Sequence, residues 1–594
     1  MLKKNKNIGA GRPKKSPVRA TIASMRKAWV GVGVLSLFVN LLMLTGPLYM
    51  LQVYDRVITS QSMSTLVVIS ILMVAMYGFM GILDFLRSRI LVRIGNFVEN
   101  ELSAPLFKTW LTQGVRGKLP AGQKPLQNLG VIKRFLTGPA PTTFFDIPWT
   151  PIYIGVIFMI DWTLGVFAIA GAIIVLFIAI VAELRTRKKE AQSQTTRSTS
   201  QQFTQKVYAN SEAVVSMGMV GEMTERWGHI KNDGVASDLS ASDISGGATA
   251  LSKAFRMFLQ SAILGLGAAL AVKQIITPGA MIAGSIILVR ALAPIQMIIG
   301  QWRNYIQTKN AYRDLNKFYE TVPMNVEKVS LPTPTGRLSV KDLAAGPPGA
   351  TKATLKNLNF DLSSGDGLCV LGHSGSGKST LARLLAGIWI PQRGAVRLDG
   401  ATLDQWDNET LGQHIGYLPQ TVDLFDGTVG ENISRFRAEA TSEVIIRAAQ
   451  ISGIHDFILS LPDGYNTILG QGGVILSVGQ IQRIALARAL FGDPCLIVLD
   501  EPNSNLDAQG DKALNAAIQY MRSQEKTVII VSHRPTAMAA VNKVLVLRNG
   551  QQEKFGLREE IFNTGNRVPP QQTMDQLKRA QEQALQTQHA TQQA

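Results

Sequence analysis

The chain has 594 residues, which allows roughly two to four domains, and its formal net charge of +18 admits nucleic acid or a membrane surface as a partner. Its two cysteines, Cys369 and Cys495, both stand in apolar runs, and the chain has no CxxC and no paired His/Cys spacing. We therefore predict two buried thiols, and we exclude a disulfide and a protein-bound transition metal.

The first 27 residues are strongly basic, with nine Lys or Arg and no acid. A nucleic-acid-binding arm is one interpretation, but beside a long apolar run a topology anchor is favoured. A cleaved signal peptide is excluded, because the apolar run that follows is too long and further runs come after it. We predict a basic cytoplasmic segment over residues 1–27 and no nucleic-acid partner.

Six runs with almost no charge follow, and about 20 apolar residues suffice to cross some 30 Å of hydrocarbon. They cover residues 28–54, 57–83, 147–160, 162–182, 257–272 and 274–289. Asp161 alone separates the third and fourth runs, which suggests a tight helical hairpin, and Lys273 alone separates the fifth and sixth. Lys and Arg gather after the second, fourth and sixth runs, so these ends and both long connections are predicted to be cytoplasmic. The sequence therefore predicts a six-span domain over residues 28–320.

Three features inside the spans stand out. Gly46 and Pro47 are expected to kink the first span, since proline cannot donate a helical hydrogen bond. Asn40 either lines a transport path or serves helix packing. Arg290 either faces a wet interior or reaches the cytoplasmic interface along its apolar stem.

The second half contains 368-LCVLGHSGSGKST-380, an apolar strand followed by GxxxxGK[ST] and a helical pattern. This is the context of a phosphate-binding P-loop, in which backbone N–H groups and a helix N-terminus surround the phosphates. Lys378 would then reach the β- and γ-phosphates, and Ser379 would bind Mg²⁺. A soluble α/β domain over residues 335–562 is predicted to bind ATP in this loop.

Two further predicted strands of this domain end in polar residues. Asp500 and Glu501 follow the buried strand in 495-CLIVLDEP-502, and His533 ends 527-TVIIVSH-533. Asp500 is expected to hold Mg²⁺, Glu501 to orient the attacking water, and His533 to contact the γ-phosphate. Gln420, after a β-like run, is expected to sense Mg²⁺ or the water.

Together these pieces resemble the nucleotide-binding domain of an ABC transporter, with 476-LSVGQ-480 as its signature. The six spans ahead of it resemble those of a half-transporter of the exporter type. The resemblance implies an all-α transmembrane domain followed by an α/β P-loop domain. It implies catalytic roles for Glu501, His533 and Gln420, Mg²⁺ ligation by Ser379, Gln420 and Asp500, and ATP contacts from Gly372, Ser374, Gly375, Gly377, Lys378, Ser379, Thr380, Ser477, Gly479, Gln480 and Asp507.

A narrower resemblance, to type I secretion permease/ATPases of the PrtD kind, is carried by segments such as 46-GPLYMLQVYDRVITSQS-62, 143-TFFDIPWTPIYIGVIF-158 and 428-TVGENISRF-436. That family implies a bacterial inner-membrane exporter of unfolded polypeptides. Its partners are membrane lipid, a periplasmic adaptor and a TolC-like outer-membrane channel. Each chain has one copy of every motif, so a homodimer is implied, in which ATP lies between the P-loop of one chain and the signature of the other.

Three residues depart from the family pattern. Val478 replaces a glycine of the signature; it would be strained if the backbone needed a positive φ there, but it would fit an ordinary helix start. Ile481 stands where a polar residue or Arg is usual. Pro347 stands where many relatives stack an aromatic ring on adenine, so nucleotide selectivity is expected to be weak.

We interpret the chain as an ATP-driven exporter with a working nucleotide site. One alternative is an exporter of lipids or small amphipathic molecules, because the spans do not specify the cargo. Another is a regulatory membrane ATPase that transports nothing. The Gln-rich residues 563–594 are expected to form a flexible tail.

Overall fold

The computed structural model describes residues 17–117, 124–321, 331–350, 352–470, 472–532 and 535–563. Contacts divide the chain into two compact units. The first holds residues 1–110 and 121–323, and the second holds residues 111–120 and 324–594.

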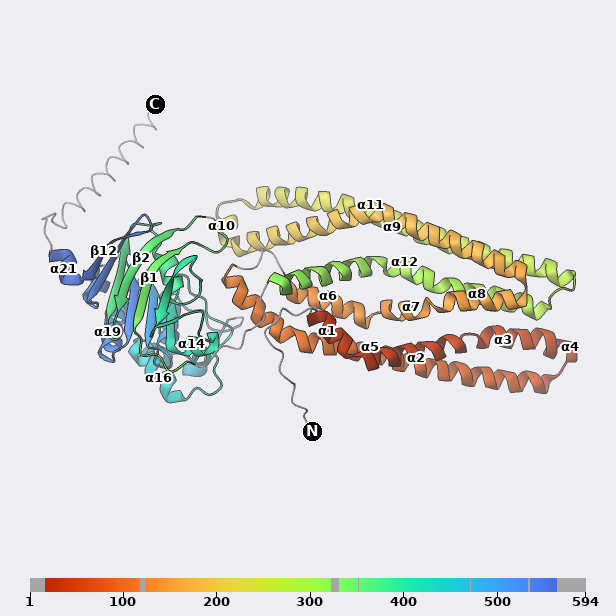
Figure 1. The fold of residues 1–594 in the computed structure, drawn as a ribbon, viewed down its shortest axis with the longest axis horizontal. Coiled ribbons are helices and arrows are strands. Elements are labelled where there is room, and N and C mark those ends of the chain that lie inside the picture. The colour runs from red at the N-terminus through yellow and green to blue at the C-terminus, as the bar shows by residue number, and fades with distance from the viewer. Residues whose placement is uncertain are drawn as a thin grey trace, which may run out of the picture. The chain divides into compact units, whose positions relative to one another are not determined.

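The first unit is built of helices, and Figure 1 shows its long helices α9 and α11 side by side. Among the described residues, six stretches are long and apolar enough to span a membrane, which confirms the predicted number. The elements are α1 (Pro17–Ser24), α2 (Arg26–Leu42), α3 (Thr45–Gln52), a π-helical turn η1 (Val53–Val57), α4 (Ile58–Ser60), α5 (Met63–Val115), α6 (Pro125–Thr137), α7 (Ala140–Asp146), α8 (Trp149–Ile160), α9 (Trp162–Ala209), α10 (Ser211–Ser216), α11 (Val220–Val272) and α12 (Pro278–Thr321).

The breaks in the spans have local causes. The first span is interrupted after Leu42 and resumes at Thr45. Pro47 has no N–H to offer the carbonyl four residues earlier, so the break falls where the sequence predicted a kink. The sixth span begins at Pro278, later than the predicted residue 274, because Gln274 takes a left-handed φ of 59° in the connecting turn.

Asn40 belongs to a buried polar cluster that joins three of the spans. Its Nδ2 donates to Asp146 Oδ1 over 2.7 Å, and Tyr153 Oη donates to the Asn40 carbonyl over 2.7 Å. Arg87 Nη1 donates to the same Asp146 oxygen over 3.1 Å. Asn40 therefore serves helix packing, the second of the two interpretations above, whereas Arg290 is exposed on α12 of the single chain.

The second unit is an α/β domain with two main sheets. Its elements are β1 (Leu338–Ala345), β2 (Leu355–Leu362), β3 (Gly367–Gly372), α13 (Lys378–Leu385), β4 (Arg393–Leu398), β5 (Ala401–Thr402), α14 (Asn408–His414), β6 (Ile415–Leu418), β7 (Gly427–Thr428), α15 (Val429–Ile433), α16 (Ser442–Ile451), α17 (His455–Leu459), a 3-10 turn η2 (Gly464–Asn466), β8 (Ile468–Leu469), α18 (Val478–Leu490), β9 (Leu496–Asp500), α19 (Ala508–Ser523), β10 (Thr527–Val531), α20 (Pro535–Ala539), β11 (Lys543–Arg548), β12 (Gln551–Leu557) and α21 (Arg558–Asn563).

The larger sheet has six strands in the order β12-β11-β3-β10-β9-β6, all parallel except β12. The carboxyl ends of β3, β10, β9 and β6 therefore share one edge, which is where ligands bind in sheets of this kind. The second main sheet, β2-β1-β4-β5, is antiparallel. Cys369 and Cys495 are both free and buried, which confirms the prediction of two buried thiols, and burial raises the pKa of the Cys369 thiol to about 12.

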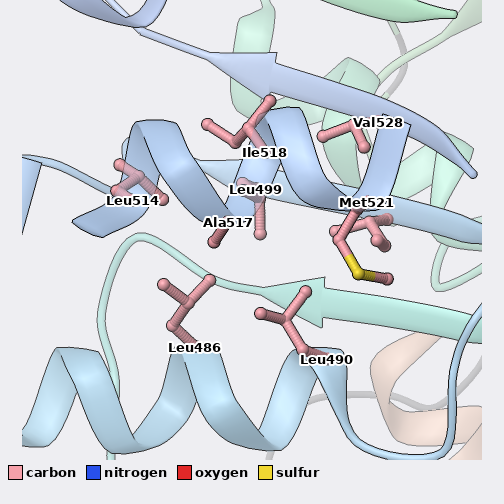
Figure 2. A pocket seen from close by; sticks show the side chains of 9 residues that line it. Leu486, Leu490, Leu499, Leu514, Ala517, Ile518, Met521 and Val528 are labelled. Atoms are coloured by element: carbon pink, nitrogen blue, oxygen red, sulfur yellow. The ribbon is translucent and has the colours of Figure 1, made fainter. Parts of the chain in front are cut away.

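One face of the large sheet packs on α18 and α19 through aliphatic side chains. Figure 2 shows these side chains, with Leu499 of β9 between the two helices. They line a cavity of about 10 Å³. The cavity is small and its lining is wholly apolar, so it does not favour a water molecule. Tight packing here fixes the carboxyl end of β9 relative to both helices.

Leu499→Ala is expected to destabilise this unit by about 2–5 kcal/mol, because it removes buried methyl groups and enlarges an existing cavity. Hydrogen exchange of the β9 and β10 amides in the full-length chain measures the change. Leu459→Ala is the matched control, since Leu459 is 59% exposed and its loss should change stability by less than about 0.5 kcal/mol. Equal exchange in both variants would contradict the packing described for β9.

Candidate functional site

The loop between β3 and α13 is shaped to surround an anion. Gly375 and Gly377 take positive φ values of 78° and 96°, which place backbone N–H groups on the inner side of a tight turn. Lys378, the first residue of α13, is buried and its Nζ donates to the carbonyls of Gly372 and His373 over 2.9 Å each. Burial lowers the pKa of Lys378, and the carboxylates of Glu501 and Asp500 oppose that shift.

The remaining predicted residues of this loop lie in the turn itself or in the first turn of the helix that follows it. Ser374 is exposed in the turn, and Ser379 and Thr380 stand in the first turn of α13. The N-terminus of a helix carries a partial positive charge and unsatisfied N–H groups, so this turn favours phosphate oxygens.

Asp500 ends β9 beside this helix turn. Ser379 Oγ donates to Asp500 Oδ1 over 3.3 Å, whereas the buried Oδ2 has no hydrogen-bond partner in the described part of the chain. Asp500 is 1% exposed, and burial raises the pKa of its carboxyl group. A hydroxyl and a carboxylate with an unsatisfied oxygen form a donor set that suits Mg²⁺. The structure therefore brings together two of the three predicted magnesium ligands.

Glu501 follows directly and has an unusual backbone. Its φ is 51°, in the left-handed region that costs a residue with a side chain about 1–2 kcal/mol. Its N–H donates to the Val531 carbonyl over 2.9 Å, which fixes it against the end of β10. Gln420, beyond the end of β6, donates from Nε2 to Glu501 Oε2 over 2.9 Å. Gln420 thus lies at the predicted catalytic carboxylate, and His533 falls outside the described residues.

The signature stretch forms the start of α18. Ser477 is its N-cap, and a capping box joins Ser477 to Gln480: the Gln480 N–H donates to Ser477 Oγ over 3.4 Å, and the Ser477 N–H donates to Gln480 Oε1 over 2.8 Å. This S-x-x-Q pattern is a sequence signal for a helix start, and it places the N-terminus of α18 without the structure. Ser477, Gly479 and Gln480 therefore lie at the N-terminus of α18.

Val478 is the first residue of α18 and is 62% exposed. It is not among the described residues with positive φ, so the ordinary helix start is the correct one of the two interpretations. The next residue differs: a Cβ on Gly479 would lie 2.9 Å from the Asn505 carbonyl oxygen, so that position needs glycine. Valine at 478 therefore costs the signature no backbone strain.

Two other predicted positions have local structural partners. Asp507 is the N-cap of α19 and accepts a hydrogen bond from the Gly510 N–H over 2.7 Å. Pro347 stands in an exposed turn closed by the Ala350 N–H, which donates to its carbonyl over 3.0 Å. The contact of Asp507 is made within its own chain and does not test its predicted place at the nucleotide interface, and Pro347 offers no aromatic ring for adenine.

A half-buried arginine that no sequence motif indicated, Arg435, binds the carboxyl-terminal end of α18. Its guanidinium donates to the Arg488 and Ala489 carbonyls over 2.9 and 3.0 Å, and to the Gly412 carbonyl over 2.6 Å. Burial lowers its pKa to about 10, so it stays charged at neutral pH. These carbonyl partners lie far away in sequence, and no spacing rule could have indicated them.

Comparison with known proteins agrees with this geometry. A family model described as "ABC transporter" matches residues 355–504, and one described as "ABC transporter transmembrane region" matches residues 29–292. The type I secretion system ATP-binding protein PrsD of Rhizobium meliloti (strain 1021) is 42% identical over 554 residues, which are 93% of this chain and 95% of PrsD.

Two more distant relatives and one solved structure are also similar. The leukotoxin translocation ATP-binding protein LktB of Mannheimia haemolytica is 27% identical over 92% of this chain and 78% of its own length. The cyclolysin secretion/processing ATP-binding protein CyaB of Bordetella pertussis is 27% identical over 89% and 75%. A bacterial Atm1-family ABC exporter with ATP bound has a TM-score of 0.73 at 21% identity, over 91% of this chain and 96% of that one, and shows the same fold.

Proposed function

Because the chain belongs to the ABC transporters, in the group of type I secretion ATP-binding proteins, we propose that it exports polypeptides as a homodimer. It is a multi-pass membrane protein whose ATPase domain couples ATP hydrolysis to transport. The 42% identity with PrsD over almost the whole of both chains carries the proposal. The names of LktB and CyaB, which concern a leukotoxin and cyclolysin, support a polypeptide as cargo.

In this proposal the P-loop holds the nucleotide. Backbone N–H groups from Gly372 to Thr380 receive the phosphate oxygens, and the Lys378 ammonium contacts the β- and γ-phosphates. Ser379 and Asp500 hold Mg²⁺, with Gln420 as a further ligand. When bound, Mg²⁺ supplies the charge that stabilises the phosphate oxygens during transfer.

Hydrolysis itself is assigned to the groups at the ends of β9 and β10. Glu501 orients the attacking water, and its carboxylate accepts the proton of that water. The hydrogen bond of the Glu501 N–H holds the backbone that carries this carboxylate. Gln420, whose Nε2 lies 2.9 Å from Glu501 Oε2, senses Mg²⁺ or the attacking water. His533 contacts the γ-phosphate. Positioning and charge stabilisation are the main requirements of phosphoryl transfer, so few groups suffice.

Each ATP is proposed to lie between two chains. Ser477, Gly479 and Gln480, at the N-terminus of α18 in one copy, approach the γ-phosphate held by the other copy, and Asp507 lies at the same interface. A helix N-terminus attracts phosphate, which supports this role for α18. One chain has one copy of each motif, so two copies give two equivalent sites.

The setting of the dimer follows from the family. We place it in a bacterial inner membrane with the nucleotide-binding domain in the cytoplasm, surrounded by lipid. Its secretion partners are a periplasmic adaptor and a TolC-like outer-membrane channel, and its cargo crosses as an unfolded polypeptide. The clustering of Lys and Arg at the ends of the second, fourth and sixth spans supports this orientation.

A comparison of the polypeptides that the host organism secretes tests this function. A deletion strain is complemented with the wild-type chain or with Glu501→Gln, and the proteins of the medium are compared. We expect specific polypeptides to reach the medium with the wild-type chain only. If the two strains secrete the same polypeptides but differ in membrane lipid composition, lipid export replaces this proposal. If they differ in neither the secreted polypeptides nor the lipids, a regulatory ATPase is favoured.

Val478→Gly is expected to change the rate of ATP hydrolysis by less than about threefold, because valine at the helix start causes no strain that glycine could relieve. Glycine there would weaken α18 by at most about 1 kcal/mol. Steady-state MgATP hydrolysis in lipid nanodiscs measures the effect. An increase of tenfold or more would mean that valine disables the signature.

A further inference from the structure

Gln482 lies one turn inside α18 and has no role in the function proposed so far. Its side chain is 3% exposed, and Nε2 donates to the Pro502 carbonyl over 2.6 Å and to the Glu501 carbonyl over 3.3 Å. Its Oε1 is buried without a hydrogen-bond partner among the described residues. The amide is thus committed to two main-chain oxygens of the segment that carries the catalytic carboxylate.

That segment needs such contacts. Glu501 has a φ of 51°, a conformation that persists only where the surroundings hold it. Two main-chain hydrogen bonds also restrain it: the Glu501 N–H donates to the Val531 carbonyl, and the Ser504 N–H donates to the Glu501 carbonyl. Ser532 Oγ also donates to the buried Asn503 Oδ1 over 3.2 Å. Gln482 joins this turn to α18 through side-chain hydrogen bonds.

The same helix touches the segment a second time. Gly479 lies so close to the Asn505 carbonyl oxygen that a Cβ would be 2.9 Å from it. Residues 501–505 therefore run along the first turns of α18. Ser477 and Gln482 are five residues apart, about 7.5 Å along the helix axis. Arg435 binds main-chain carbonyls at the other end of α18, so the helix has side-chain contacts at both ends.

We propose that Gln482 is a positioning residue that ties the signature helix to Glu501 of its own chain. This inference rests on the proposed composite sites. In them the N-terminus of α18 serves the ATP of the partner chain, whereas Glu501 serves the ATP of its own chain. One helix therefore contacts both ATP sites. When the ATP of the partner chain displaces α18, the Glu501 carboxylate at the ATP of its own chain also moves.

Gln482→Met tests the proposal, because methionine keeps the length of the side chain and removes both hydrogen bonds. The full-length variant in lipid nanodiscs is expected to show a kcat at least tenfold below wild type. The Kd for a fluorescent ATP analogue should stay within twofold, since the P-loop is untouched. Hydrogen exchange over residues 501–507 should be at least fivefold faster. Gln450→Met, at an exposed position of α16, is the matched control and should change none of these values.

A kcat within twofold of wild type would overturn the proposal, and so would a lower kcat with unchanged exchange over residues 501–507. If Gln482→Met does not assemble, Gln482→Asn replaces it, since it keeps an amide but withdraws it by one methylene. Glu501→Gln serves as the blank. A wild-type chain no faster than this blank would count against the proposed function, and the exchange data would then decide on Gln482 alone.

Discussion

Glu501→Gln is expected to lower the rate of ATP hydrolysis by about 10²- to 10⁴-fold, the range found for loss of a general base. Glutamine has the same shape but cannot take up the proton of the attacking water. Its backbone can keep the left-handed φ of Glu501, because the bond from the residue 501 N–H to the Val531 carbonyl does not involve the side chain. The Kd for ATP should therefore change by less than about twofold.

Steady-state hydrolysis and nucleotide binding in nanodiscs measure the two effects separately. Glu443→Gln is the control, because Glu443 is exposed in the first turn of α16 and has no part in the site. A Glu501→Gln variant that keeps more than a tenth of the wild-type rate would remove Glu501 from the catalytic role.

Lys378→Ala is expected to weaken ATP binding by roughly 30- to 4000-fold, which corresponds to about 2–5 kcal/mol for one partner of a buried charge pair. The ammonium group is buried inside the loop and lies near two carboxylates, so its removal leaves the phosphates without their main cation. The loop also loses the hydrogen bonds to the Gly372 and His373 carbonyls.

Fluorescence titration with an ATP analogue measures this Kd. Lys356→Ala is the matched control, because Lys356 is an exposed lysine on β2 of the same domain. A loss of affinity below about threefold for Lys378→Ala, or an equal loss in the control, would show that the loop does not bind ATP in the proposed way.

The sequence predicted the membrane part well where charge alone decides the outcome. Uncharged runs located all six spans, because charged groups are costly in hydrocarbon. The start of the sixth span was predicted four residues too early, since hydropathy does not report the left-handed turn at Gln274. The hydrogen-bond partner of Asn40 could not be predicted either, because Asp146 is 106 residues away in the sequence.

The candidate site divides in the same way. The P-loop and the carboxylates after β9 follow from a strand–loop–helix pattern, and the structure places Ser379, Asp500, Glu501 and Gln420 together. The consequence of Val478 depended on whether its φ is positive, which the residue type does not determine. Gln482 could not be predicted, because its partners are main-chain carbonyls of a turn whose shape only the fold defines.

The central claim is that each ATP is shared by two chains, and mixed dimers test it most directly. One dimer carries Lys378→Ala in one chain and Ser477→Arg in the other. A second dimer carries both substitutions in one chain beside a wild-type partner. Shared sites leave one intact site in the first dimer and none in the second, so we expect MgATP hydrolysis in nanodiscs from the first dimer alone. Hydrolysis from the second dimer alone would mean that each chain forms its own site, and would contradict the account.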